Sequence, residues 1–84
     1  MINDDSLKRI IMENLPGVER GEASLIYLRI SVTQDLKSLG GDFSEVQFQK
    51  CLRELHDTQR LFMFSNGWVK ATKSGLVAFG IQNY

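Results

Sequence analysis

The sequence contains little of what several common classes of protein need. Among its 84 residues there are one cysteine, one histidine and one proline, and ten basic side chains balance ten acidic ones. The single thiol of Cys51 has no internal disulfide partner, and with His56 it falls short of the four ligands of a structural zinc site. We therefore expect no bound metal and no cofactor.

Long apolar runs are absent as well. The uncharged stretches fall well short of the roughly 20 residues that cross a bilayer, and the first residues are acidic and polar. These features predict a cytoplasmic protein without a membrane partner. The length corresponds to one small domain, residues 1–84. The zero net charge argues against a non-specific binder of polyanions.

No arrangement of side chains points to catalysis. Cys51 and His56 are five residues apart, a spacing that does not stack them on one helix face, so we expect no nucleophilic pair. The Gly40-Gly41 pair follows a predicted helix, whereas a phosphate-binding glycine loop follows a strand. We therefore expect no catalytic residue and no enzymatic activity, and we interpret Cys51 as a small buried apolar side chain.

The first helix is predicted over about residues 5–15. Apolar side chains recur there at helical spacing, and the Pro16-Gly17 pair that follows is a strong stop signal. The residues expected to face the core are Leu7, Ile10, Ile11 and Leu15.

Residues 22–39 have two interpretations. An apolar stripe at helical spacing predicts one helix over 22–39 that ends at Gly40-Gly41. A short alternation of apolar and polar residues instead predicts a strand near 27–30, then a helix over 32–39 capped by Ser31. We favour the single helix because more positions match it. Its stripe is Leu25, Leu28, Val32, Leu36 and Leu39.

A further helix is predicted to begin after an N-cap at Asp42 or Ser44 and to end near Gln59. Gln47 lies three residues after Ser44, the spacing of a capping box. The buried stripe of this helix is expected to be Phe48, Cys51, Leu52 and Leu55.

The strongest local signal is a β-hairpin. Residues 61–65 and 68–72 flank Asn66-Gly67, a pair that suits the positive φ angles of a type I′ turn. A short helix over 73–79 is predicted to follow, with Leu76 and Phe79 facing inward.

The order of these elements resembles a winged helix-turn-helix domain. Ser31–Leu39 looks like the first helix of the turn motif in bacterial winged-helix regulators of the multiple-antibiotic-resistance type, and Phe43–Leu61 resembles their recognition helix. Val69–Gly75 is similar to their second wing strand and the Thr-x-x-Gly step into a final helix. The resemblance covers about residues 31–76. It implies an α+β, mainly helical fold with three helices, a C-terminal two-stranded hairpin wing and a short final helix.

The resemblance also implies a small transcriptional regulator that reads the major groove of double-stranded DNA with helix 44–59. Helical geometry places Val46, Gln49, Lys50 and Arg53 outward on this helix, where they can contact base edges and phosphates. The sequence departs from the family in its short wing tip, which lacks an arginine-rich loop, and in Glu54 and Asp57, which dilute the positive charge of the helix.

The charge is unevenly distributed along the chain. Residues 1–42 have five basic and seven acidic side chains, and residues 43–84 have five basic and three acidic ones. The basic half contains the candidate recognition helix and wing, where Arg60, Lys70 and Lys73 can reach flanking phosphates. Because the excess of positive charge in this half is small, we expect two copies to act together as a homodimer on a pseudo-palindromic site.

The alternative is an interaction module, an adaptor or inhibitor, that binds a protein instead of DNA. The neutral charge and an apolar C-terminal end (Leu76, Val77, Phe79, Ile81 and Tyr84) favour it. A positive surface across Lys50, Arg53, Lys70 and Lys73 would favour nucleic acid, and an interrupted one a protein partner. Trp68, next to the turn, either stacks on a base or a sugar or packs against the hairpin or the neighbouring helix.

Overall fold

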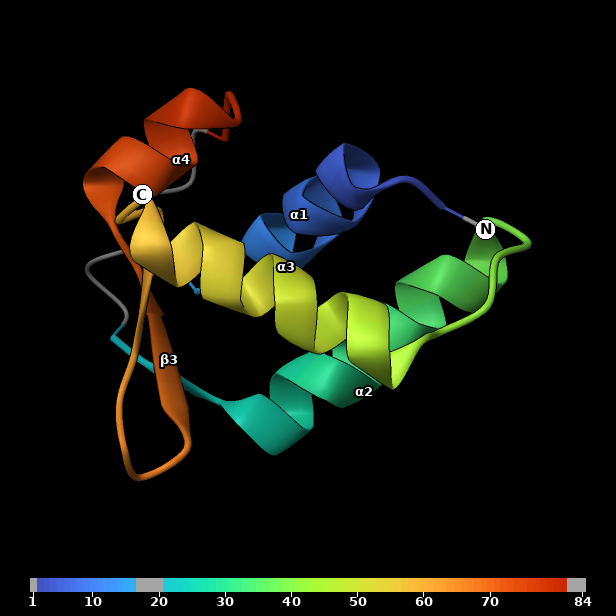
Figure 1. Cartoon of the computed structure of the whole chain (residues 1–84), viewed down its shortest axis with the longest axis horizontal. Coiled ribbons are helices and arrows are strands. Elements are labelled where there is room, and N and C mark those ends of the chain that lie inside the picture. Colours follow the sequence, from blue (N-terminus) through green and yellow to red (C-terminus); the bar gives the residue numbers. More distant parts are fainter. Residues whose placement is uncertain (1, 17–20, 82–84) are drawn as a thin grey trace.

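Four helices and three short strands make up the described part of the chain, residues 2–16 and 21–81 of this computed structural model (Figure 1). The fold is α+β and mostly helical, as the sequence predicts. The three strands form one antiparallel sheet in the order β1-β3-β2. The elements are α1 (Asp4–Glu13), β1 (Ala23–Ser24), α2 (Leu25–Ser38), α3 (Glu45–Asp57), β2 (Leu61–Met63), β3 (Trp68–Ala71) and α4 (Lys73–Ala78).

Each helix begins at a side chain that accepts a hydrogen bond from a backbone amide three residues later. Such N-caps satisfy amides that have no partner inside the helix. The acceptor and donor pairs are Asn3 and Ser6 at 2.7 Å, Ser24 and Tyr27 at 3.1 Å, Ser44 and Gln47 at 3.3 Å, and Thr72 and Gly75 at 3.0 Å.

The core lies between the helices and the inner face of the sheet, and the predicted stripes supply most of it. Leu25 is half-buried, and Leu39, which follows the last residue of α2, is 70% exposed. The other predicted stripe residues of α1, α2 and α3 are buried, as is Leu76 of α4; Phe79 is half-buried and packs on the core. Leu61, Val69 and Ala71 face this core from the sheet.

Residues 22–39 form one helix over most of their length, so the alternative strand near 27–30 is wrong. The predicted start at residue 22 is also wrong. Ala23 and Ser24 pair with Val69 and Trp68 as strand β1, and the amide of Leu25 donates to the carbonyl of Gly67 at 2.8 Å. This tertiary pairing holds the backbone extended up to the Ser24 N-cap, where α2 begins.

The sheet has three strands, which corrects the expected two-stranded hairpin. Strands β2 and β3 form the predicted hairpin, in which Phe62 is paired with Lys70 and Met63 with Val69. Strand β1 joins the other edge of β3. A strand of two residues carries no alternating pattern, so the sequence could not indicate it.

The hairpin loop is not the expected type I′ turn. That turn needs positive φ angles at both central residues, and here Gly67 has a φ of 85° while Asn66 is not in the left-handed region. The Gly67 amide donates to the Phe64 carbonyl at 3.2 Å, and the Phe64 amide donates to the Trp68 carbonyl at 2.9 Å. The loop thus has three residues, and the glycine takes the left-handed position.

The helix ends differ from the predictions by a few residues. Helix α1 ends at Glu13, α3 ends at Asp57 and α4 ends at Ala78. Gln59, with a φ of 62°, lies in the tight turn after α3. The predicted capping box is half formed: Ser44 caps the helix, but the Gln47 side chain donates to the carbonyl of Ile2 at 2.7 Å. The predicted stop residue Gly17 and the apolar Tyr84 lie outside the described residues.

Candidate nucleic-acid interface

The four residues predicted to read DNA lie together on the outer face of α3. Val46 is 82% exposed, and Gln49, Lys50 and Arg53 are exposed as well. They line an open hollow of about 470 Å³ along the helix. Three acidic residues, Glu45, Glu54 and Asp57, share this lining, so the face contains charges of both signs.

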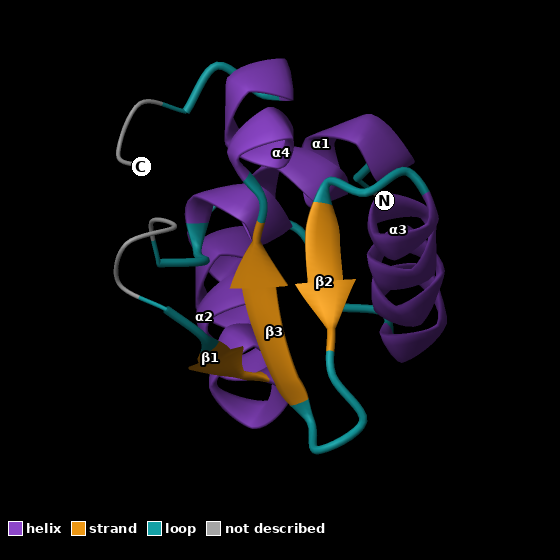
Figure 2. Ribbon diagram, turned by 90° about the vertical axis from the view of Figure 1, so that its left-hand side faces the viewer, coloured by secondary structure: helices purple, strands orange, loops and turns teal. Residues whose placement is uncertain are grey.

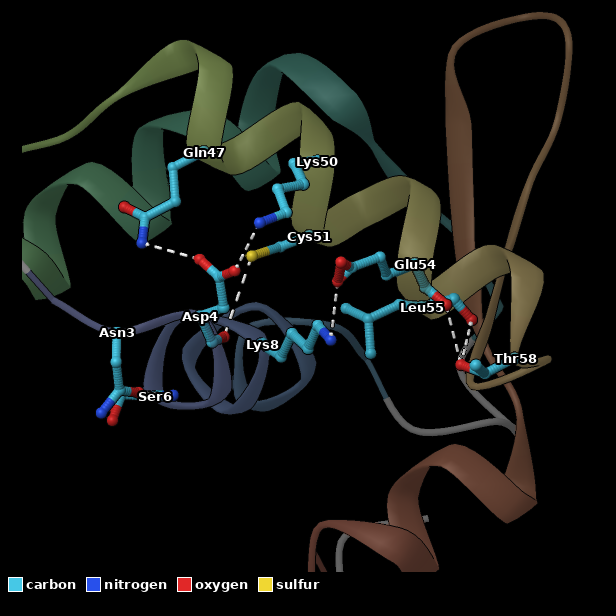
Figure 3. A network of polar contacts seen from close by, with 10 residues as sticks. All are labelled: Asn3, Asp4, Ser6, Lys8, Gln47, Lys50, Cys51, Glu54, Leu55 and Thr58. Atoms are coloured by element: carbon cyan, nitrogen blue, oxygen red, sulfur yellow. Dashed lines mark hydrogen bonds and ion pairs between the residues drawn. The ribbon is translucent and has the colours of Figure 1, made fainter.

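Contacts between α1 and α3 neutralise Lys50 (Figure 3). Its ammonium group lies 2.9 Å from the Asp4 carboxylate, which also accepts a hydrogen bond from Gln47 at 3.1 Å. These bonds hold the pKa of Asp4 below its usual value, and the bond to Asp4 raises the pKa of Lys50. On the next turn, Lys8 pairs with Glu54 at 3.0 Å, which raises the pKa of Lys8.

A second set of contacts involves Glu45 at the start of α3. The Glu45 carboxylate accepts a hydrogen bond from Gln49 at 2.8 Å and forms an ion pair with Arg29 of α2 at 2.9 Å. Both partners hold the pKa of Glu45 below its usual value. The Arg29 guanidinium carbon also lies 5.7 Å from the centre of the Phe48 ring, a cation–π distance. The Gln49 side chain is therefore engaged in a hydrogen bond within its own helix.

The remaining predicted cations have no ion-pair partner among the described residues. They are Arg53 on α3, Arg60 in the turn after it, Lys70 on β3 and Lys73 at the start of α4. Within residues 43–81, Asp57 is the one carboxylate without such a partner. Lys50 is thus paired with a carboxylate, whereas the cations from Arg53 onward are not, and the unpaired Asp57 shares the lining with Arg53.

The turn that carries Arg60 is tied to the start of α4. The Thr72 hydroxyl lies 2.7 Å from the Gln59 carbonyl and 3.0 Å from the Arg60 carbonyl, and it also accepts the Gly75 amide. Gly75 lies directly against the Arg60 backbone. These contacts place Lys73 beside the end of α3, although the two elements are separated in sequence by the whole hairpin.

The outward side of the hairpin adds two residues, Phe62 and Phe64, to the Trp68 and Lys70 that the sequence already indicated. Phe62, Phe64 and Trp68 are exposed there beside the half-buried Lys70, and we call these four residues the outer hairpin face. Alternation along residues 61–64 was a usable signal, because it places Phe62 and Phe64 opposite the buried Leu61. Asp4 was missed as well, since nothing local links it to Lys50.

Cys51 is fully buried, and burial raises the pKa of its thiol to about 11. The part of the chain that the structure describes contains no group of three or more histidine, cysteine, aspartate or glutamate side chains able to hold a metal ion. No helix within residues 2–16 and 21–81 has the length and apolar character that crossing a membrane requires.

Comparison of the chain with protein-family models, with curated protein sequences and with solved structures gave no match.

Proposed function

We propose that this chain is a winged helix-turn-helix domain that binds double-stranded DNA, with α3 in the major groove and the β2–β3 hairpin as a short wing. The observation that carries the proposal is the set of cations without ion pairs: Arg53, Arg60, Lys70 and Lys73. These four belong to α3 and the elements that follow it, and phosphate contacts supply much of the affinity of DNA-binding proteins.

The exposed side chains of α3 suit base contacts. Val46 lies in the first turn, where it can meet a thymine methyl group, and Gln49 can pair with adenine after it releases Glu45. Arg53, one turn further on, can bind guanine or a phosphate. The first part of a recognition helix enters the groove, which supports base contacts by Val46 and Gln49, and Arg53 would lie further along the groove.

The contacts made by Lys50 reduce the affinity expected of one copy. Its ion pair with Asp4 must open before the ammonium can bind a phosphate. We therefore propose that two copies act as a homodimer, because two-fold symmetry doubles the number of phosphate contacts and matches a pseudo-palindromic site.

The test is duplex binding by Arg53→Ala, measured as fluorescence anisotropy of random-sequence duplexes about 30 base pairs long, close to three helical turns. We expect affinity to fall with salt concentration, and the substitution to weaken binding by about 1–3 kcal/mol. Arg9→Ala is the matched control: it removes the same charge from α1, where Arg9 is exposed and pairs with Glu13. Equal losses in both variants, or no salt-dependent binding, would overturn the proposal.

The second candidate is a protein-interaction module, favoured by the charges of both signs on the outer face of α3 and by exposed apolar residues on α2. Of the predicted C-terminal residues, Val77 is 57% exposed, but Leu76 is buried and Phe79 and Ile81 are half-buried. Ile26, Tyr27 and Ile30 are instead exposed on neighbouring turns of α2. Light scattering of Ile26→Ser and Ile30→Ser tests whether a second copy covers this face: a dimer should become monomeric. If neither variant changes the molar mass, a second copy does not cover this face.

A further inference from the structure

The outer side of the sheet is open and aromatic. A sheet with one buried face usually carries polar side chains on the other. Here Phe62, Phe64 and Trp68 point outward and are 51%, 39% and 41% exposed. Figure 2 shows α2 behind the sheet, α3 beside it and α4 above it, and no described element crosses the front of the sheet. Packing in the core does not account for three exposed rings on one short hairpin, and such a patch is typical of a binding surface.

Cross-strand pairing and ring contacts arrange the outer hairpin face. Phe62 is paired with Lys70 across the strands, and Phe64 donates its amide to the Trp68 carbonyl, so the four side chains form two neighbouring cross-strand pairs. The rings of Phe62 and Phe64 lie 5.7 Å apart, centre to centre. The His56 ring meets Phe62 edge to face at 5.4 Å, and His56 Nδ1 accepts the amide of Met63. Neighbouring rings therefore position Phe62 and Phe64 on this face.

The hairpin also has an open hollow whose lining includes the ammonium-bearing side chain of Lys70. Phe62, Phe64, Lys70, Ala71 and Thr72 line an open space of about 330 Å³. No carboxylate contributes to this lining, and Lys70 makes no ion pair within the described part of the chain. A ligand that fills the hollow and matches its charge must combine a flat apolar surface with an anion.

We propose that the outer hairpin face binds unpaired nucleotides of a single-stranded nucleic acid, with bases stacked on the aromatic rings and phosphates paired with Lys70. Aromatic rings next to basic side chains are the general solution for binding single strands, because every base presents a π-face. In a duplex the bases are already stacked on one another. This ligand is therefore distinct from the double-stranded DNA proposed for α3.

Trp68 is the only tryptophan of the chain, so its fluorescence reports directly on this face. The full chain is titrated at low salt with oligothymidylate of about ten nucleotides, within the usual site size for single-strand binders. We expect saturable quenching of Trp68 that weakens as salt is added. A parallel titration with oligouridylate shows whether the sugar matters, and saturable quenching by either strand supports the proposal. Absence of saturable quenching by both strands would overturn it.

Two substitutions separate stacking from simple apolar contact. Phe62→Leu and Phe64→Leu keep an apolar side chain but remove the π-face, and each is expected to weaken oligonucleotide binding about tenfold. Lys70→Ala should lower the salt dependence by about one phosphate contact. Leu39→Ala, at the far end of α2, is the control for loss of an exposed apolar side chain and should bind as the wild type does. Circular dichroism checks that each variant is folded.

Lys70 belongs to both proposals, so Arg53→Ala and the two leucine variants are the substitutions that distinguish this site from the duplex site on α3. If Arg53→Ala loses duplex binding and Phe62→Leu does not, while the reverse holds for the single strand, both sites exist. If both leucine variants bind oligonucleotides as tightly as the wild type, the face is not a stacking site, whatever the duplex measurements show. Loss of single-strand binding in Arg53→Ala alone would assign that ligand to α3 and overturn the inference.

Discussion

Gly75 lies against the backbone of Arg60, so close that a Cβ at this position would overlap the Arg60 carbonyl oxygen and lie 2.7 Å from the carbonyl carbon. The contact joins the first turn of α4 to the turn that follows α3. It explains why the Thr-x-x-Gly step needs a glycine, although Gly75 has an ordinary helical backbone without a positive φ. The Thr72 hydroxyl strengthens this contact, because it donates to the Gln59 carbonyl and accepts the Gly75 amide.

Gly75→Ala is therefore expected to be strongly destabilising. The added methyl group meets backbone atoms, which cannot rotate away, so we expect a loss of about 3 kcal/mol in the free energy of unfolding. Urea denaturation measures it. Gly41→Ala is the matched control, because a Cβ there would lie at an ordinary 3.6 Å from the Leu36 carbonyl oxygen. Similar stability in the two variants would contradict the close contact.

The Asp4–Lys50 ion pair predicts how stability depends on pH. Because the pKa of Asp4 is held below 3.8, its contribution is fully present above pH 3.8 and is lost as the pH falls through the lowered value. The raised pKa of Lys50 acts at the other end of the pH range: its contribution is fully present below pH 10.5 and is lost as the pH rises through the raised value.

Asp4→Asn should remove this acid dependence. Between about pH 5 and pH 2, the free energy of unfolding should fall less steeply in the variant than in the wild type, as measured by urea denaturation at a series of pH values. Asp5→Asn is the control, since Asp5 also lies in the first turn of α1 and makes no ion pair within the described residues. Parallel curves for Asp4→Asn and the wild type would rule out the linkage.

The same substitution should strengthen duplex binding if α3 contacts DNA. Asp4→Asn removes a carboxylate and releases Lys50, so we expect higher affinity and a salt dependence steeper by about one phosphate contact. Asp5→Asn changes the net charge equally but leaves the Lys50 ion pair intact. If both variants gain the same affinity, the gain comes from net charge alone and Lys50 is not a DNA contact.

Cys51 should be inert in the folded protein. With the pKa of its thiol raised to about 11, only about one thiol in a thousand is ionised at pH 8, and the side chain is fully buried. Dithionitrobenzoate should therefore react slowly in buffer and at once, with one thiol per chain, in concentrated urea. Rapid reaction in buffer would show that the α1–α3 contact opens readily.

Much of the fold was predictable because its signals are local. The apolar stripes of α1 and α3, the N-cap Ser44 and the hairpin each depend on residues within a few positions of one another. The turn type and the start of α2 were not predictable. The start of α2 depends on how β1 pairs with β3, a contact between segments about half the chain apart. The glycine at position 67 suits a three-residue loop as well as a type I′ turn.

For the candidate site, the sequence by itself determined which side chains α3 turns outward, because helical periodicity separates them from Phe48 and its buried neighbours. Only the tertiary structure decided which of those charges remain unpaired. Asp4 reaches Lys50 across 46 residues because α1 packs on α3, and Arg53 has no such neighbour among the described residues. Packing of distant helices sets these distances, and no local pattern in the sequence encodes them.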